Sequence, residues 1–301
     1  MEDNQQNNFG IVMLYKELRK NITAFLGLII VFILLSAAIF TVVDQTFFDR
    51  GLISSVLHDP LKMEVTRMME APSREHPLGL DKFGRDILAR IIYGSKIAVE
   101  VGVVATGIAI LLGIIIGTTA AYYGGRIDDV LMRIMEILYS IPGLVLALTM
   151  MAALGPSVMN AMIAVGVIRI PSYARVIRSR ALSVSSQEYI KAVQAYGGGD
   201  MRIIFRHVLP NSVAPVIIQA SLGIGSAIIT VSSLSFLGFG VQPPTPSWGR
   251  LLSAGRDVLL VAPHIATFPG IAILFAVMGF NLFGDGLRDI LDPKLRGESM
   301  V

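Results

Sequence analysis

The sequence predicts an all-α polytopic membrane protein, and three observations lead to this fold class. The 301 residues are 53% hydrophobic and only 16% charged, whereas soluble domains have roughly 25% charged residues. Mean hydropathy is +0.67. Several stretches without Asp, Glu, Lys or Arg are as long as the roughly 20-residue helix that spans the hydrocarbon of a bilayer. These values exclude an ordinary soluble enzyme.

Charge balance and cysteine content exclude two further classes. The chain has 25 Lys and Arg against 22 Asp and Glu, a net charge of +3, which is too small an excess for nucleic acid to be the main partner. Because it contains no cysteine, it has no disulfide, no thiol catalysis and no Cys-ligated metal or iron–sulfur site.

Uncharged stretches predict six membrane-spanning helices, since a charge at the bilayer centre is costly. The stretch 137–168 is interrupted by Gly155-Pro156, which predicts two helices joined by a tight turn. These two helices are too long for the stretch, so we expect Glu136 and Arg169 near a membrane surface. The six helices are expected near residues 22–43, 98–122, 134–154, 157–175, 211–239 and 263–283.

The distribution of Lys and Arg predicts the orientation. Six spans place both termini on one side, and the loops of that side are richer in Lys and Arg, with seven of them from Arg169 to Arg206. Cytoplasmic loops carry such an excess. We expect residues 1–95 to form an N-terminal tail, the first helix and an extracytoplasmic loop, 96–285 a five-helix domain, and 286–301 a cytoplasmic tail.

The cytoplasmic loop 185–211 contains the most informative pattern. Ser185-Ser186-Gln187-Glu188 fits a capping box, which predicts that a helix begins at Ser185. An apolar stripe with helical spacing follows, made of Tyr189, Ala192, Val193 and Tyr196, so this helix is amphipathic.

A second helix is expected directly after the first. Three glycines at 197–199 supply the left-handed backbone that ends the first helix. Asp200 can cap a helix over 201–209, and Pro210 stops it. The loop is therefore predicted to be a helix, a turn and a helix.

Three interpretations fit this helical loop. It can lie on the bilayer surface, read nucleic acid as a helix-turn-helix, or dock on a cytoplasmic partner. The helix-turn-helix interpretation is disfavoured, because the loop lies between two membrane-spanning helices. Hydrophobic periodicity does not separate the other two interpretations, so the residues alone leave that choice open.

The same residues resemble a known motif. Glu188-Tyr189-x-x-Ala192-x-x-Ala195-x-Gly197, followed by His207-Val208-Leu209-Pro210-Asn211, is similar to the EAA loop of ABC importer membrane subunits, in the form of the dipeptide and oligopeptide permease family. Further matching segments are 76–86, 234–238, 242–249 and 281–295. The resemblance covers nearly the whole chain after about His76 and points to the C-type subunit. Two positions depart from the family pattern. Leu80 stands where the family usually has Thr, and Ser247 stands where it often has Glu.

The resemblance implies a type I ABC importer permease subunit in a bacterial cytoplasmic membrane, with both termini cytoplasmic. It would form half of a pathway for di- or oligopeptides. Glutathione, or nickel and its chelates, are alternative substrates in the family. The implied partners are a companion permease in a heterodimer, two ATPase subunits, an extracytoplasmic substrate-binding protein and membrane lipid.

The resemblance also implies roles for individual residues. The coupling residues toward the ATPases would be Glu188, Tyr189, Ala192, Ala195, Gly197, Asp200 and Pro210. Trp248 stands beside three prolines and suits an interfacial anchor or a contact with the binding protein.

We expect the chain itself to be neither an enzyme nor a cofactor-binding protein. It lacks the G-x-x-x-x-G-K-[ST] pattern, and the glycines at 197–199 precede neither the Lys nor the hydroxyl that would hold phosphate and magnesium. ATP and magnesium are therefore expected on the partner ATPases. A more remote alternative is an ion-coupled secondary transporter, but such proteins usually need ionisable groups at membrane depth.

Two weaker patterns are read as structural. Gly113, Gly117 and Ala121 form a stripe of small residues that favours ordinary helix packing. His76, Asp81 and Asp86 could suggest a metal site, but one histidine with scattered acids is poor support for it. We expect no metal there, and a capped segment leading into the second span instead.

Overall fold

The computed structural model describes residues 22–291, which are helical apart from turns, loops and one isolated bridge between Leu80 and Asp86. The long helices are α2 (Ile22–Phe47), α4 (Ile87–Tyr123), α7 (Val158–Ser185), α10 (Ala214–Phe236) and α12 (His264–Leu291). The shorter ones are α3 (Gly51–Val56), α5 (Gly125–Ser140), α6 (Gly143–Leu154), α8 (Glu188–Ala195), α9 (Asp200–Ile203) and α11 (Trp248–Arg256). A 3₁₀ turn covers Val65–Arg67, and a π-helical turn covers Ile204–Val208. Residues 1–21, and residues 292–301 of the tail expected over 286–301, lie outside these residues, while α12 continues through 286–291.

Four helices, α2, α4, α10 and α12, are long and apolar enough to cross a membrane. The pair α5 and α6 makes a fifth if the two count as one span, although they meet at an angle of 90°. The long helix α7 is not among them and carries Arg169, Arg175, Arg178 and Arg180. The all-α membrane fold is therefore confirmed, and the count of six spans stays a prediction.

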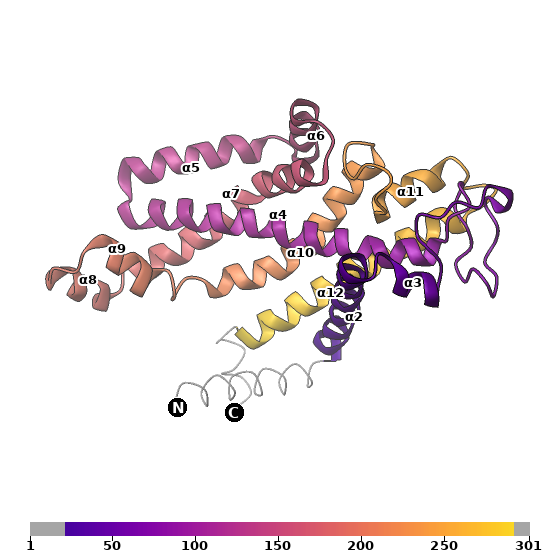
Figure 1. The fold of residues 1–301 in the computed structure, drawn as a ribbon. Helices are drawn as coiled ribbons and strands as arrows, with labels where there is room; N and C mark the ends of the chain where they lie inside the picture. The colour runs from indigo at the N-terminus through magenta and orange to yellow at the C-terminus, as the bar shows by residue number, and fades with distance from the viewer. Residues whose placement is uncertain (1–21, 292–301) are drawn as a thin grey trace.

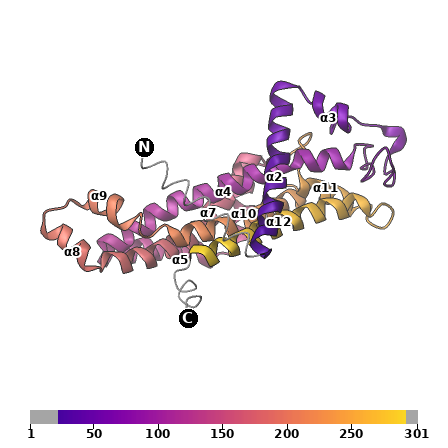
Figure 2. The same cartoon turned by 90° about the horizontal axis from the view of Figure 1, so that it is seen from below.

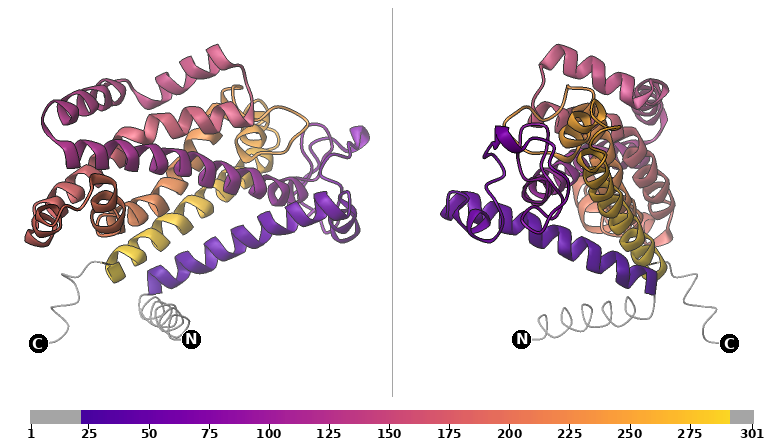
Figure 3. Two further views of the ribbon diagram at one scale, coloured as in Figure 1. Left: turned by 60° about the vertical axis from the view of Figure 1, so that its left-hand side comes forward. Right: turned by 90° about the vertical axis from the view of Figure 1, so that its right-hand side faces the viewer.

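The prediction of one helix near 134–154 is wrong, because this stretch is divided between α5 and α6. The chain breaks at Ile141 and Pro142, where Ile141 has an extended backbone with φ −82 and ψ 126. Proline has no amide hydrogen for the helix ladder and disfavours helical backbone at the preceding residue. Figure 3 shows α5 and α6 along the outer side of α4 and α7, bent against each other.

The central helix α4 packs tightly along α7 (Figure 1). A Cβ added at Gly117 would lie 2.1 Å from Ile177 Cγ2 and 2.3 Å from the carbonyl oxygen of Ala174. At Gly113 it would lie 2.6 Å from the Tyr173 Cβ. Small residues thus let the two backbones approach closely, which confirms that the predicted stripe is a packing surface.

The main core lies where α4, α6, α7 and α10 meet. It is built largely of small and medium apolar side chains, including Val101, Ala105, Met151, Val165 and Leu234. Helix α2 crosses the other long helices on one face of this bundle (Figure 2) and contacts α4 and α12.

The bundle presents two opposite ends (Figure 1). Helices α8 and α9 lie at one end, beyond the last turn of α4. The segment between α2 and α4 lies at the other end, together with α11. The sequence motifs therefore separate into a site at each end.

Candidate functional site

One side of α8 anchors it to the bundle. Ile190 is fully buried and Val193 is partly buried, in a cluster with Ala121 of α4 and with Ala181 and Val184 of α7. Helix α8 is thus attached to both α4 and α7, because its inner side shares a core with the ends of those helices.

The other side of α8 exposes the motif residues Glu188, Tyr189, Ala192 and Ala195. Tyr189 is 45% exposed, and Tyr196, just after the helix, is 94% exposed. The predicted stripe was therefore wrong at Val193, which faces inward, while its other members face outward. Helix α8 has an apolar surface that nothing in residues 22–291 covers.

The start of α8 differs from the predicted capping box. Helix α7 continues through Ser185, and Gln187 is the residue that precedes α8, so Glu188 occupies the first helical position. The Ser185 hydroxyl is buried and has no hydrogen-bond partner among the residues described. The capping box is wrong because α7 extends past its expected end and moves the turn to Ser186 and Gln187.

The end of α8 follows the prediction at Gly197. Its φ is +80, its amide donates to the Gln194 carbonyl at 2.9 Å, and the Gly198 amide donates to the Val193 carbonyl at 3.0 Å. These two bonds form a Schellman motif, in which the residue at Gly197 must be left-handed. Gly199 is not left-handed, with φ −68.

Asp200 does not cap the second helix as expected. Gly199 precedes α9 and Asp200 is its first residue, so the carboxylate is free to accept a hydrogen bond from the Tyr122 hydroxyl at 2.8 Å. The helix expected over 201–209 is divided into α9 and a π-helical turn, in which the Leu209 amide donates to the Ile204 carbonyl. Pro210 follows this turn, where the helix was expected to stop.

At the opposite end, the segment before α4 is capped as the sequence predicted. Asp86 Oδ1 accepts from the Ala89 amide at 2.8 Å and caps α4. Asp81 Oδ1 accepts from the Phe83 amide at 2.7 Å, and its Oδ2 accepts from Arg85 Nε at 2.8 Å. Gly84 forms a turn in this segment, with φ +72.

Arg67 holds the same segment through two carboxylates. Its Nε donates to Glu70 Oε2 at 2.6 Å, and its guanidinium also donates to Glu75 Oε1 at 2.9 Å. These hydrogen bonds stabilise the ionised forms and lower the pKa of Glu70 and of Glu75. Both carboxylates therefore stay charged at neutral pH and keep Arg67 between them.

Trp248 packs inside the chain. Its side chain begins α11, is 4% exposed, and donates from Nε1 to the Ile91 carbonyl of α4 at 2.9 Å. A contact between Trp248 and a binding protein stays a prediction, for which this side chain offers almost no surface.

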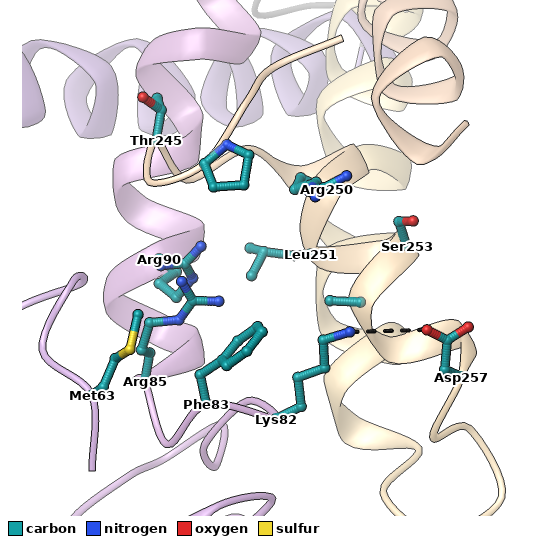
Figure 4. Close-up of a pocket in the computed structure, with 12 residues that line it drawn as sticks. Met63, Lys82, Phe83, Arg85, Arg90, Thr245, Arg250, Leu251, Ser253 and Asp257 are labelled. Atoms are coloured by element: carbon teal, nitrogen blue, oxygen red, sulfur yellow. Dashed lines mark ion pairs between the residues drawn. The ribbon is translucent and has the colours of Figure 1, made fainter. Parts of the chain in front are cut away.

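A cationic pocket of about 350 Å³ lies between the start of α4 and α11 (Figure 4). The cations that line it are Lys82, Arg85, Arg90 and Arg250. Lys82 lies 3.9 Å from Asp257, and Arg85 lies 2.8 Å from buried Asp81. Sequence reasoning missed this pocket because its lining comes from residues 63–90 and 243–257, which only the fold brings together.

Known proteins match the chain over most of its length. Residues 109–297 match the model of a family described as "Binding-protein-dependent transport system inner membrane component". The dipeptide transport system permease protein DppC of Alkalihalophilus pseudofirmus is 42% identical over 94% of this chain and 89% of its own length. The probable D,D-dipeptide transport system permease protein DdpC of Escherichia coli K12 is 44% identical over 80% and 81%. The glutathione transport system permease protein GsiD of Pectobacterium atrosepticum is 43% identical over 76% of each.

A solved structure shares the fold. A chain of the inward-facing MetNI methionine ABC transporter aligns with a TM-score of 0.56 and 15% identity, over 67% of this chain and 96% of its own length. At this identity the likeness concerns the fold alone.

Proposed function

This chain belongs to the family of binding-protein-dependent transport system inner membrane components, and on that premise we propose that it forms half of the pathway of an ATP-driven peptide importer. It is a multi-pass membrane protein with the fold of a type I ABC importer permease. Its relatives place it with the C-type subunits.

The observation that carries the coupling role is the two-sided character of α8. The exposed side holds Glu188, Tyr189, Ala192 and Ala195, while Ile190 and Val193 fix the inner side to α4 and α7. A partner that moves α8 therefore also moves the long helices. This arrangement favours the docking interpretation of the loop over the bilayer-surface interpretation, since α8 lies beyond the end of the long helices (Figure 1).

ATP hydrolysis is assigned to two partner ATPase subunits, which would also hold the magnesium ions. Support comes from the sequence, which has no phosphate-binding loop of the Walker type. The chain is then a non-catalytic subunit, with its termini and α8 on the cytoplasmic side. A companion permease of the same fold completes the pathway as a heterodimer.

The cationic pocket at the other end is proposed to receive an acidic side chain of the extracytoplasmic binding protein. Arg250 is half-buried on α11 and has no ion-pair partner among residues 22–291. It replaces Trp248 as the contact that we propose on this helix.

Dipeptides are the proposed substrates, because two of the relatives are named for dipeptide or D,D-dipeptide transport. Glutathione, itself a small peptide, is the second candidate, because a relative at 43% identity is a glutathione permease.

Reconstitution tests this function. The binding protein is first purified and its bound ligand identified by mass spectrometry. Proteoliposomes with the chain, its companion permease and two ATPases should take up that ligand when ATP and the binding protein are supplied. Uptake by the chain alone, or uptake driven by an ion gradient without ATP, would contradict the proposal.

A further inference from the structure

The segment between α2 and α4 brings two histidines to one carboxylate. His76 Nδ1 lies 2.8 Å from Asp86 Oδ2, and His58 Nδ1 lies 3.5 Å from the same oxygen. The two imidazole rings are stacked at a tilt, with centroids 4.3 Å apart. Three polar atoms from distant positions in the sequence therefore converge on one point at the extracytoplasmic end.

The cluster is enclosed by the protein, and two of its nitrogens lack a partner. The side chains of His76 and Asp86 are 2% and 1% exposed, and that of His58 is 31% exposed. His58 Nδ1 and His76 Nε2 are buried without a hydrogen bond to any of the residues described. Buried polar atoms in native proteins are normally paired, so the unpaired His58 Nδ1, which faces Asp86 Oδ2, points to a missing occupant.

We propose that His58, His76 and Asp86 bind one divalent transition-metal ion of the zinc type. Two imidazole nitrogens and one carboxylate oxygen suit Zn²⁺, whereas Mg²⁺ and Ca²⁺ prefer oxygen ligands throughout. The ion would be resident in the protein and distinct from any transported substrate.

The two distances from Asp86 Oδ2 fit a tetrahedral centre with little movement. Bonds of about 2.0–2.2 Å place ligand atoms about 3.4 Å apart around such a centre. The His58 to Asp86 separation of 3.5 Å already has this value. The His76 to Asp86 separation of 2.8 Å would open by about half an ångström.

Metal binding would also give the second nitrogen of His76 a proton to donate. With the ion on Nδ1, the ring proton sits on Nε2, which lies 3.7 Å from Glu75 Oε1 and would form a hydrogen bond only after a small movement toward it. Metal-ligating histidines commonly donate their other N–H to such a carboxylate. Without the ion, Nδ1 donates to Asp86 and Nε2 is left as an acceptor with no donor.

The two carboxylate oxygens of Asp86 have different roles. Oδ1 accepts from the Ala89 amide and caps α4, so Oδ2 is available to the ion. The ion would thus tie the chain around His58 and His76 to the first turn of α4.

Metal titration tests the site. The chain is purified without a polyhistidine tag, stripped with a chelator and titrated with Zn²⁺, Co²⁺ and Mg²⁺. We expect one equivalent of Zn²⁺, visible absorption of Co²⁺ typical of nitrogen ligation, and no response to Mg²⁺ at the same concentrations. Failure of the wild-type chain to bind Zn²⁺ would overturn the proposal.

Variants locate the ion. His58→Ala removes the more exposed ligand and leaves the His76 to Asp86 bond intact, so the segment is expected to fold. Loss of an outer-sphere partner already costs about 10- to 100-fold in metal affinity, and loss of a ligand should cost at least as much. His207→Ala, a histidine from the loop at the other end, should bind like the wild type. Equal affinity in the His58→Ala and His207→Ala variants would show adventitious binding and contradict the site.

Discussion

The Tyr122 hydroxyl at the end of α4 donates a hydrogen bond to Asp200 Oδ1 at the start of α9 over 2.8 Å. This bond attaches the proposed coupling loop to α4 at a second point, because Ile190 and Val193 already hold α8 to the same end of the bundle. The loop is therefore fixed on both sides of its glycine turn.

Removing this attachment should weaken coupling without abolishing transport. Tyr122→Phe keeps the ring, which packs in the Ile190 cluster, and deletes only the hydroxyl. An exposed hydrogen bond contributes little to global stability, roughly 0.5–1.5 kcal/mol. We expect normal abundance and a rise in ATP hydrolysed per substrate transported, measured in proteoliposomes. Asp200→Ala, which removes the acceptor, should act similarly, and if the two effects simply add in the double variant, the bond is not the cause.

Gly197→Val should uncouple the transporter while it still inserts normally. A β-branched residue at φ +80 is strained by roughly 1–3 kcal/mol, and relief of that strain would turn α8 away from the ATPase surface on which we propose that it docks. Transport and stimulation of ATPase activity by the loaded binding protein should largely disappear.

A matched control for this change is available two residues later. Gly199 has φ −68, and a Cβ there meets nothing within 4 Å, so Gly199→Ala should transport like the wild type. Gly197→Asn should be intermediate, since Asn tolerates left-handed backbone. Wild-type transport by Gly197→Val at equal abundance would rule out α8 as the coupling element.

The contact between α4 and α7 predicts a difference between two glycines of one helix. Gly117→Ala forces a methyl group against Ile177 and the Ala174 carbonyl, and such overpacking costs about 1–3 kcal/mol. A Cβ at Gly107 meets nothing within 4 Å, so Gly107→Ala should be neutral or stabilising by up to about 1 kcal/mol through helix propensity. Thermal unfolding in detergent measures both, and equal melting temperatures would contradict the close approach.

Arg250 should matter for the response to the binding protein. Arg250→Gln removes one cation of the pocket, so stimulation of ATPase activity should require several-fold more binding protein, most clearly at low ionic strength, where exposed charges are least screened. Arg256→Gln, on the same helix but outside the pocket lining, is the control. If both variants respond alike, the pocket is not the docking point.

The sequence contained enough to predict the fold and the C-terminal end of α8. Hydropathy located α2, α4, α10 and α12, because long apolar runs have few alternatives to a membrane helix. Gly197 was predictable as well, since a glycine after an amphipathic stripe commonly ends a helix.

Other features depended on tertiary contacts. The capping-box prediction was wrong because packing extends α7 through Ser185. A local sequence pattern does not contain information on such tertiary contacts. Pro142 marks a helix break in the sequence, but the long apolar run around it led us to expect one continuous helix. His58 was missed because 18 and 28 residues separate it from His76 and Asp86, across a segment without periodic pattern.

The length of α4 makes it a lever. Its 37 residues span about 55 Å at 1.5 Å per residue, from the capping residue Asp86 to the neighbour of Asp200. Its close contact with α7 at Gly113 and Gly117 couples the two helices, so a tilt of α4 would carry α7 with it. A tilt of about 5° at one end would displace the other by about 5 Å over this length, roughly one helical turn, so a small rotation at the loop would become a large movement at the opposite end of the bundle.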